Sequence, residues 1–293
     1  MTATAASLEA QAKINLTLRV LAREEGGFHQ LETLFARIEL ADSVRVVTDT
    51  AVREVDCRGA EVGPMERNLA FRAADAFAAE TGWPKGFRID IEKRIPVGGG
   101  LGGGSADAGA VLRILNALAP APLSDAALAT IAFRLGADVP FLATEAPLAL
   151  AWGRGERMLA LNSLPAREVV LCLPAFGVET AAAFGWLAES RLGAPQTAPA
   201  ALRSEDLDRW DGIARLAQND FEAVVMPRHP EIAICLEALV AARSRIARMS
   251  GSGSTVYGIF DRRPPASIPG VPAAMRLVHT RTTTSVAQVR ALD

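Results

Sequence analysis

The sequence contains little cysteine and little lysine, and it has no long apolar run. Its cysteines, Cys57, Cys172 and Cys235, are odd in number, widely spaced and without a CxxC pair, which indicates reduced core thiols in a cytoplasmic protein. No stretch of eighteen apolar residues occurs, and the first residues lack the basic start and apolar core of a signal peptide. We therefore expect neither a membrane-spanning helix nor a secretory leader.

The chain also lacks a strong charge imbalance. The formal net charge is −2, and the longest basic run is Arg262-Arg263, so nothing favours a nucleic-acid or membrane-surface partner. Half of the 293 residues are hydrophobic and 22% are charged, which predicts a substantial core and excludes a disordered chain. The length allows one large domain or two ordinary ones, and the order of expected strands and helices indicates an α/β (α+β) fold.

Glycine is concentrated in one stretch, residues 96–106, PVGGGLGGGSA, in which six of the seven residues from Gly98 to Gly104 are glycine. Residues 87–91 before it alternate apolar and polar, which predicts a strand, and residues 108–119 after it have helical spacing. Without Cβ atoms such a loop adopts positive φ and brings backbone N–H groups close to a ligand. The free N–H donors of the following helix add to this, so the stretch predicts a phosphate-binding site.

A flexible linker is the simpler alternative, but linkers are seldom followed at once by a strongly apolar helix. The stretch is not a Walker A loop, because Gly104-Ser105 has no lysine between the two residues. Gly98, Gly100 and Gly103 formally match GxGxxG, yet residues 124–135 predict another helix where the dinucleotide fingerprint requires a strand that ends in an acid. That match is weak.

Lysine is rare enough to make each one a candidate for a specific task. Of 31 basic residues only Lys13, Lys85 and Lys93 are lysine, and lysine supplies a compact point charge that arginine does not. Lys85 lies in an expected solvated turn. Lys93, just before the glycine stretch, either reaches a bound nucleotide or caps an exposed strand.

Lys13 belongs to a predicted strand, residues 12–20, that follows an expected frayed lead-in, residues 1–10. Apolar and polar residues alternate in strict period two, so that Lys13, Asn15 and Thr17 share one face. That face is either an ordinary solvent face or the wall of a cleft that presents one ammonium and one carboxamide.

Several further positions have an ordinary structural role beside a functional one. Asn68 is a good N-cap for a helix over residues 69–80 that Gly82 closes, and it is equally a candidate ligand contact. Asp138 lies in residues 136–141, where Pro140 predicts an extended Val139. It is either a turn residue or a carboxylate held rigidly at a cleft. Residues 31–40 predict a strand or a helix, and residues 231–247 a helix.

Three separated motifs together resemble those of the GHMP small-molecule kinases. Residues 96–106 are similar to the family's central ATP-phosphate loop, residues 12–16 to its N-terminal motif and residues 250–253 to its C-terminal glycine motif. Within the family, the start AKINLTLRV, the turn GFH, the double GGG loop and the segment GADVP most resemble one branch. Its members phosphorylate a cytidine diphosphate sugar alcohol in non-mevalonate isoprenoid biosynthesis.

The resemblance implies ATP-dependent phosphorylation of the tertiary 2-hydroxyl of the methylerythritol unit, with Mg²⁺ accompanying ATP. It also implies a two-domain fold with the active site between the domains. Residues 1–155 would form a ribosomal-S5-like, ATP-binding domain and residues 156–293 a ferredoxin-like domain.

Carried over residue by residue, the resemblance assigns roles to named positions. Asp138 matches the family's catalytic acidic residue, whose carboxylate accepts the hydroxyl proton. Lys13 matches the paired lysine, which would keep Asp138 ionised and offset charge on the γ-phosphate. The expected ATP-binding residues are Pro96, Val97, Gly98, Gly99, Gly100, Leu101, Gly102, Gly103, Gly104, Ser105 and Ala106, with Asn68 and Lys93. The expected substrate-binding residues are Asn15, Phe28, His29, Thr180 and Phe184.

The resemblance has one departure and leaves one gap. Phe28 replaces the usual tyrosine, so stacking on cytosine would remain while a hydrogen bond from the phenol would not. No protein ligand of Mg²⁺ is identified from the sequence.

Two other functions remain open. A homoserine or mevalonate type of GHMP kinase would share the loop and the glycine motif, but it would lack the paired AKxN start and the GFH turn. A non-catalytic nucleotide-binding module would bind ATP without turnover and would be expected to have lost the lysine or the aspartate, and both are present.

Overall fold

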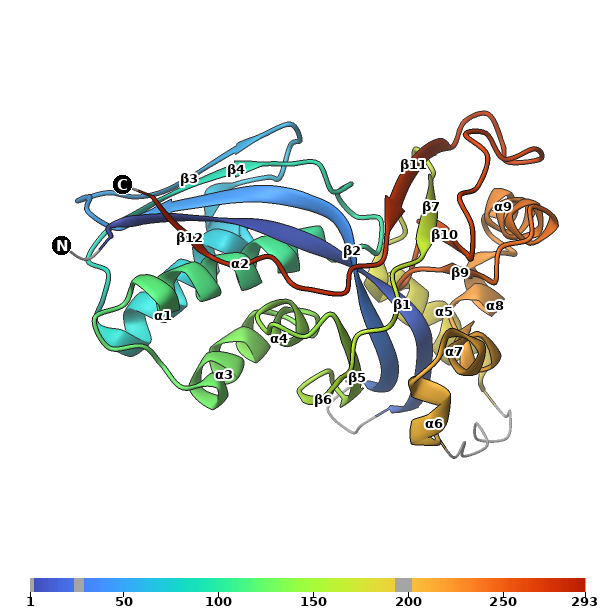
Figure 1. Ribbon diagram of the computed structural model, residues 1–293, viewed down its shortest axis with the longest axis horizontal. Coiled ribbons are helices and arrows are strands. Elements are labelled where there is room, and N and C mark those ends of the chain that lie inside the picture. The colour runs from blue at the N-terminus through green and yellow to red at the C-terminus, as the bar shows by residue number, and fades with distance from the viewer. Residues whose placement is uncertain (1–2, 24–28, 193–201, 293) are drawn as a thin grey trace.

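The computed structural model describes residues 3–23, 29–192 and 202–292. Within these residues the strands form an eight-stranded and a four-stranded sheet, seen at the left and right of Figure 1. The larger sheet has the order β12-β1-β2-β4-β3, and β5, β6 and β8 extend it. Its strands are β1 (Ala5–Arg23), β2 (His29–Val47), β3 (Arg53–Arg58), β4 (Phe87–Glu92), β5 (Leu148–Gly153), β6 (Arg157–Leu161), β8 (Gln218–Asn219) and β12 (Arg290–Leu292).

The long antiparallel pair of β1 and β2 is the backbone of the larger sheet. Residues 31–40 are therefore strand rather than helix. The predicted frayed lead-in is wrong, because β1 begins at Ala5 and pairs with the end of β2. Lys13, Asn15 and Thr17 are buried like the apolar residues between them, so the solvent-face alternative for β1 is also wrong. Polar side chains that are buried in this way need hydrogen-bond or ion-pair partners.

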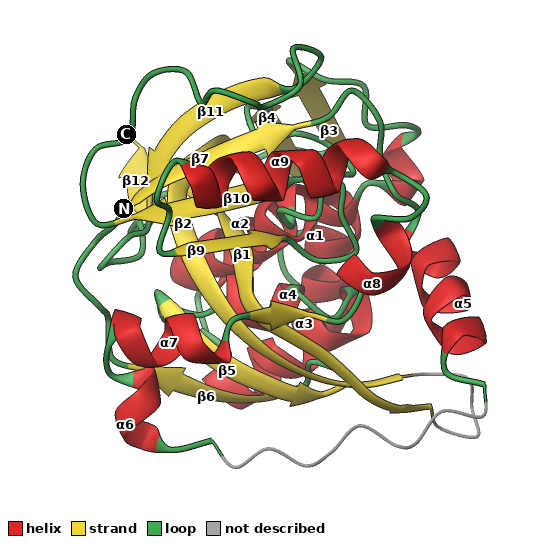
Figure 2. Ribbon diagram, turned by 90° about the vertical axis from the view of Figure 1, so that its right-hand side faces the viewer, coloured by secondary structure: helices red, strands yellow, loops and turns green. Residues whose placement is uncertain are grey.

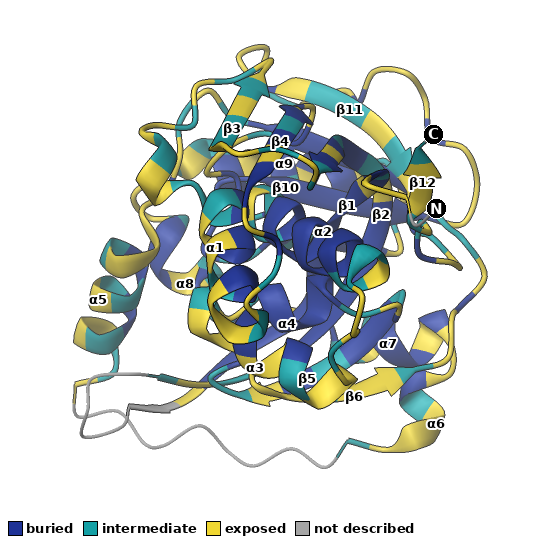
Figure 3. Cartoon of the chain, turned by 90° about the vertical axis from the view of Figure 1, so that its left-hand side faces the viewer, coloured by how far each residue is buried: buried dark blue, intermediate teal, exposed yellow. Residues whose placement is uncertain are grey.

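Helices cover one face of this sheet, as Figures 1 and 3 show. They are α1 (Leu69–Thr81), α2 (Gly103–Leu118), α3 (Asp125–Leu135) and α4 (Val139–Leu142), with the 3₁₀ turn η1 (Met65–Arg67) before α1. The predicted caps of α1 are confirmed: the Asn68 side chain accepts from Ala70 N at 2.8 Å, and Gly82 ends the helix with φ 72°. Helix α2 has ten buried residues, more than any of the other three, and it begins within the glycine stretch, earlier than its apolar pattern predicts.

The smaller sheet has the order β11-β7-β10-β9. Its strands are β7 (Glu168–Leu173), β9 (Ile246–Met249), β10 (Val256–Phe260) and β11 (Arg276–Arg281). Strand β7 alternates between two cores: Val169 and Leu171 pack with the larger sheet, whereas Val170 and Cys172 pack with the helices on the other side. Those helices include α5 (Thr180–Ser190), α8 (Glu222–Val225) and α9 (Pro230–Ala241); in Figure 2, α9 lies in front of the sheet and α8 and α5 lie to its right. The short helices α6 (Ser204–Leu207) and α7 (Trp210–Leu216) lie between α5 and β8 in sequence.

The predicted helix over residues 231–247 is wrong in its last part. Helix α9 ends at Ala241, and Arg243 adopts a left-handed φ of 64°. The following residues form β9, which pairs with β10. Pairing with a neighbouring strand therefore decides the conformation of a segment whose composition also suits a helix.

The change from one sheet to the other lies between β6 and β7, a few residues after the predicted division at 155/156. That division falls in the hairpin of β5 and β6, which pair with each other. Later segments return to the larger sheet, because β8 and β12 both pair with β1. The assignment of residues 1–155 and 156–293 to two domains stays a prediction.

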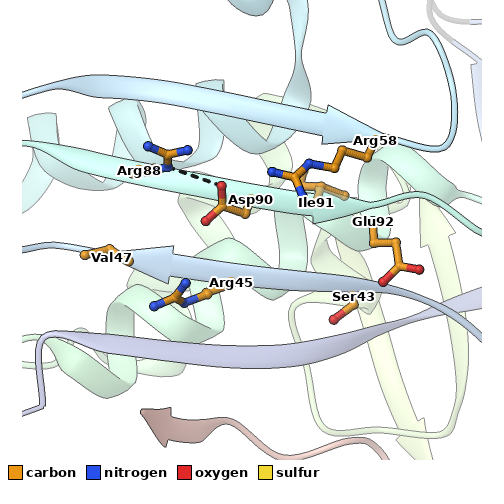
Figure 4. A pocket seen from close by; sticks show the side chains of 8 residues that line it. All are labelled: Ser43, Arg45, Val47, Arg58, Arg88, Asp90, Ile91 and Glu92. Atoms are coloured by element: carbon orange, nitrogen blue, oxygen red, sulfur yellow. Dashed lines mark hydrogen bonds and ion pairs between the residues drawn. The ribbon is translucent and has the colours of Figure 1, made fainter. Parts of the chain in front are cut away.

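The outer face of the larger sheet is open and charged. Side chains of β2, β3 and β4 line a shallow hollow there, shown in Figure 4: Ser43, Arg45, Val47, Arg58, Arg88, Asp90, Ile91 and Glu92. Three arginines lie there beside two carboxylates, and Arg88 Nε contacts Asp90 Oδ1 at 3.2 Å. Exposed ion pairs of this kind are typical of a sheet face in contact with solvent. In the described ranges, no helix is long and apolar enough to cross a membrane.

Candidate active site

The glycine stretch forms a loop between β4 and α2 with alternating left-handed residues. Gly98, Gly100 and Gly102 have φ of 74°, 77° and 71°. Gly102 is also the N-cap of α2, and no side chain caps that helix end. Backbone N–H groups around left-handed residues form concave, anion-binding nests, and the uncapped helix start adds further donors. The loop therefore has the conformation expected of a phosphate site.

Two distant segments hold this loop. Ser250 Oγ donates to Gly100 O at 2.8 Å, and Lys13 N donates to Leu101 O at 3.0 Å. The approach is so close that a Cβ on Gly100 would lie 2.1 Å from Ser250 O. The structure thus brings together the three separated motifs of the sequence.

Lys13 and Asp138 form an ion pair beside the loop. Lys13 Nζ lies 3.2 Å from Asp138 Oδ2, and the lysine side chain is 3% exposed whereas the aspartate is 30% exposed. A Cβ on Gly102 would lie 3.1 Å from Lys13 Cε, which places the lysine stem against the loop. The buried ammonium is held in position, while the carboxylate is open to a ligand.

Asp138 owes its position to α4, which begins at the next residue. Pro140 occupies the first turn of α4, a position that tolerates proline because no N–H is required there. The predicted extended Val139 is therefore wrong. Helix α4 approaches α2 so closely that a Cβ on Gly109 would lie 2.5 Å from Leu142 O. Packing against α2 holds the short helix, and with it Asp138, beside the phosphate loop.

A chain of hydrogen bonds orients Lys13 from the other side. Its Nζ donates to Asn15 Oδ1 at 2.7 Å, and Asn15 Nδ2 donates to Thr33 Oγ1 at 2.8 Å. Thr33 Oγ1 in turn donates to Thr17 O at 2.7 Å. The carboxamide oxygen of Asn15 is thus engaged as the acceptor for Lys13. The sequence patterns do not single out Thr33. Its position opposite β1 follows only from the antiparallel register of β1 and β2, in which Thr33 faces Leu18.

Tyr257 on β10 is a second residue that the sequence did not single out. Its hydroxyl donates to Asn15 O at 2.7 Å, and complete burial raises the pKa of this phenol above its ordinary value. Thr255 lies on the same segment, with a buried Oγ1 that has no protein partner and a backbone N–H that donates to Gly99 O at 3.2 Å. The smaller sheet therefore contacts both the lysine strand and the loop.

Asn68 lies at a pocket near the start of α1. The pocket has a volume of about 430 Å³ and is lined by Val55, Cys57, Ala60, Glu61, Val62, Gly63, Met65 and Asn68. Asn68 Nδ2 donates to Cys57 Sγ at 3.4 Å, and burial raises the pKa of that thiol. A Cβ on Gly104 would lie 3.6 Å from Cδ1 of Leu69, the residue after Asn68, so the pocket and the loop adjoin. Cys172 and Cys235 are core thiols as predicted, whereas Cys57 is only half-buried.

Lys93 is not at the surface. Its ammonium donates to Asp107 Oδ2 at 2.6 Å and to Asp42 Oδ2, and its side chain is 3% exposed. The predicted cap of an exposed strand is therefore wrong. Burial raises the pKa of Asp107 to about 7, against the opposing effect of Lys93. A contact between this ammonium and ATP stays a prediction, and the two ion pairs argue against it.

Of the expected substrate residues, Asn15 and His29 lie on strands of the larger sheet, whereas Thr180 and Phe184 lie on α5. His29 at the start of β2 stacks on Phe184 of α5, with ring centroids 4.6 Å apart and an angle of 19°. Thr180 Oγ1 lies 3.0 Å from Ser252 Oγ. The chain thus brings together rings that are far apart in sequence. Phe28 lies outside the described residues.

Comparison with known proteins gives matches over most of the chain. The model for the N-terminal domain of GHMP kinases matches residues 68–145, and the model for their C-terminal region matches residues 199–268. A 4-diphosphocytidyl-2-C-methyl-D-erythritol kinase of Geobacter sp. (strain M21) is 40% identical over 257 residues, 87% of this chain and 89% of that protein. The kinase of that name from Symbiobacterium thermophilum is 39% identical over 260 residues, 87% and 91% of the two chains.

The chain belongs to the GHMP kinase family.

Solved structures agree with this. A crystal structure of a 4-(cytidine 5'-diphospho)-2C-methyl-D-erythritol kinase superposes on this GHMP kinase with a TM-score of 0.74 and 34% identity, covering 94% of this chain and 99% of that one. Homoserine kinase from Cytophaga hutchinsonii has a TM-score of 0.67 at 14% identity, with 98% of both chains covered, and shows the fold alone. The predicted GHMP kinase fold of mixed α/β type is confirmed.

Proposed function

We propose that this protein is a 4-diphosphocytidyl-2-C-methyl-D-erythritol kinase, which transfers the γ-phosphoryl group of ATP to the 2-hydroxyl of that substrate. The relatives with this activity share about 40% identity over nearly nine-tenths of the chain. The observation that carries the proposal at the level of chemistry is the Lys13–Asp138 pair, 3.2 Å apart beside the phosphate loop.

The proposed reaction uses few protein groups, because phosphoryl transfer depends mostly on positioning and charge neutralisation. The Asp138 carboxylate accepts the proton of the 2-hydroxyl as its oxygen bonds to the γ-phosphorus, and the bond from that phosphorus to the β-γ bridging oxygen breaks to release ADP. Lys13 orients the carboxylate and offsets negative charge on the transferring group. The 30% exposure of Asp138 leaves it accessible to the acceptor.

ATP is placed by the loop and the pocket next to it. The N–H groups of residues 96–106 and of the α2 start would receive the phosphates. The pocket at Asn68 is lined by apolar Val55, Val62 and Met65 together with polar Glu61 and Asn68, a combination that suits a purine base. These two sites adjoin through Leu69 and Gly104, as the continuous nucleotide requires.

Mg²⁺ belongs to this proposal as the companion of ATP. Among the residues that the structure describes, no group of three or more His, Cys, Asp or Glu side chains could hold a metal ion. This fits a cation that phosphate oxygens and water hold, as Mg²⁺ usually is in kinases, with at most one or two carboxylates added. When bound it neutralises phosphate charge; the protein's part is to hold those phosphates with the loop.

The acceptor would lie on the side of His29, Thr180 and Phe184. Imidazole and phenyl rings suit a cytosine ring, and hydroxyls suit a polyol. Because His29 and Phe184 stack on each other here, a cytosine would either use an outer ring face or separate the pair. Asn15 acts in this proposal mainly by holding Lys13, to which its oxygen is already bonded.

The test is ADP release with 4-diphosphocytidyl-2-C-methyl-D-erythritol, run beside homoserine and mevalonate. We expect turnover with the cytidine substrate alone. Phosphorylation of homoserine or mevalonate instead would keep the kinase chemistry and refute the substrate. Binding of ATP without turnover on any acceptor would favour the non-catalytic module.

The same assay tests the two central residues. We expect Lys13→Met and Asp138→Asn each to lower kcat by a factor of about 10² or more, while the affinity for ATP changes little. Lys85→Met and Asp125→Asn are matched controls, because both side chains are exposed and neither has a role in the proposed reaction. Near-normal kcat in either test variant would remove that residue from the mechanism.

A further inference from the structure

A buried cluster of three charges lies beneath the phosphate loop. Asp42 of β2 is fully buried, and the side chains of Lys93 and Asp107 are 3% and 6% exposed. The residues come from three segments: a central strand, the end of β4 and the first turns of α2. The proposed phosphoryl transfer uses none of their side chains.

Asp42 divides its two carboxylate oxygens between different partners. Its Oδ1 accepts the backbone N–H groups of Arg94 at 2.5 Å and Ile95 at 2.8 Å, the residues that lead into the loop. Its Oδ2 accepts from Lys93 Nζ. One side chain therefore fixes the entry of the loop to a strand of the large sheet.

Lys93 extends this tie to the exit of the loop. Its ammonium also donates to Asp107 Oδ2 at 2.6 Å, and a Cβ on Gly103 would lie 3.4 Å from Lys93 Nζ. The loop thus has both ends joined through one ammonium. A glycine-rich segment gains most from such anchoring, because its free backbone has the most conformational freedom to lose.

Lys93 Nζ uses two of its three N–H donors on these carboxylates, and its side chain is 3% exposed, so the ammonium would have to move away from both carboxylates to reach a phosphate on the outer side of the loop. Moving the ammonium to a phosphate would leave Asp42 and Asp107 buried and unpaired, and a broken buried ion pair is strongly unfavourable. Asp107 Oδ1 is already buried without a partner. The cluster therefore has no spare cation to offer a ligand.

We propose that Asp42, Lys93 and Asp107 are positioning residues that hold the phosphate loop in its ATP-binding conformation, with Lys93 acting through the loop and not on the nucleotide. This inference rests on the proposed function only in taking ATP as the ligand of the loop. We call Asp42, Lys93 and Asp107 the clamp; their contacts are present in the chain without ligand.

Two substitutions distinguish the clamp from a direct contact. In Asp42→Asn the amide has one acceptor oxygen, so either the loop N–H groups or Lys93 loses its partner. We expect Asp42→Asn and Lys93→Met each to raise the KM for ATP at least about tenfold and the KM for the acceptor less than about twofold. The KM for ATP of the double variant should be little higher than that of either single variant, because both substitutions break the same connection between the two ends of the loop.

A direct contact predicts another pattern. Lys93→Met would then weaken ATP binding, whereas Asp42→Asn, which removes a negative charge near the phosphates, would leave it unchanged or strengthen it. Glu92→Gln is the matched control, since it makes the same change of charge one residue from Lys93 on an exposed side chain. A role in stability alone would lower the melting temperature without changing the KM for ATP.

Hydrogen–deuterium exchange of residues 96–106, measured without nucleotide on a millisecond scale, separates this inference from the proposed function. We expect faster exchange in Asp42→Asn and Lys93→Met than in Glu92→Gln and the parent. Unchanged exchange together with an unchanged KM for ATP overturns the clamp, even if the protein is the proposed kinase. Faster exchange in a protein without kinase activity would keep the clamp and refute the function.

Discussion

Gly100→Ala tests whether the contact between the loop and the C-terminal glycine motif is as tight as the structure has it. The new Cβ would lie 2.1 Å from Ser250 O, at a residue whose φ is 77°. A left-handed alanine costs about 1–2 kcal/mol. Relieving the overlap needs a shift on the order of 1 Å and costs about 1–3 kcal/mol more. We expect a total loss of about 2–5 kcal/mol in the free energy of unfolding.

Gly98→Ala provides the matched comparison. Gly98 has a similar φ of 74°, but a Cβ there meets nothing within 4 Å. We therefore expect a loss of only about 1–2 kcal/mol, from the backbone alone. Urea unfolding of the two variants and the parent gives both numbers, and their difference isolates the overlap with Ser250.

The displaced loop should also affect turnover. Lys13 N donates to Leu101 O, so a shift at Gly100 reaches the strand that carries the proposed catalytic lysine. A misplacement of about 1 Å can cost a factor of about 10² in rate, and we expect a fall of that order in kcat. Equal destabilisation of Gly98→Ala and Gly100→Ala, with full turnover in the latter, would refute the close packing of the two motifs.

Two further predictions concern buried polar groups. Tyr257→Phe should lower the free energy of unfolding by about 1–2 kcal/mol, because Asn15 O loses its buried donor; a urea midpoint equal to the parent's would contradict this. Burial raises the pKa of Asp107 from 3.8 to about 7, so between these values the folded state holds a proton that the unfolded chain has released, and stability falls as pH rises through this window. Asp107→Asn removes that dependence, so its free energy of unfolding should rise relative to the parent's between about pH 4 and 7, and parallel stability curves would argue against the raised pKa.

Local chemistry determined the parts that depend on neighbours in sequence. Asn68 and Gly82 are caps that bracket α1 because each satisfies backbone groups within a few residues. The glycine stretch predicts a phosphate loop because positive φ is available without steric cost, and the structure has three such residues there. Period-two alternation likewise placed Lys13 and Asn15 on one face, where they are hydrogen-bonded.

Tertiary structure decided everything that depends on which segments meet. The partner of Lys13 is Asp138 because packing of α4 on α2 brings that carboxylate to β1. Lys93 lies beneath the loop and not on it because two carboxylates from other segments take its ammonium. Residues 246–249 form a strand because β10 offers a ladder. Contacts between residues far apart in sequence form only when the whole chain folds, because the residues next to a carboxylate or a strand do not determine which distant segment will pack against it.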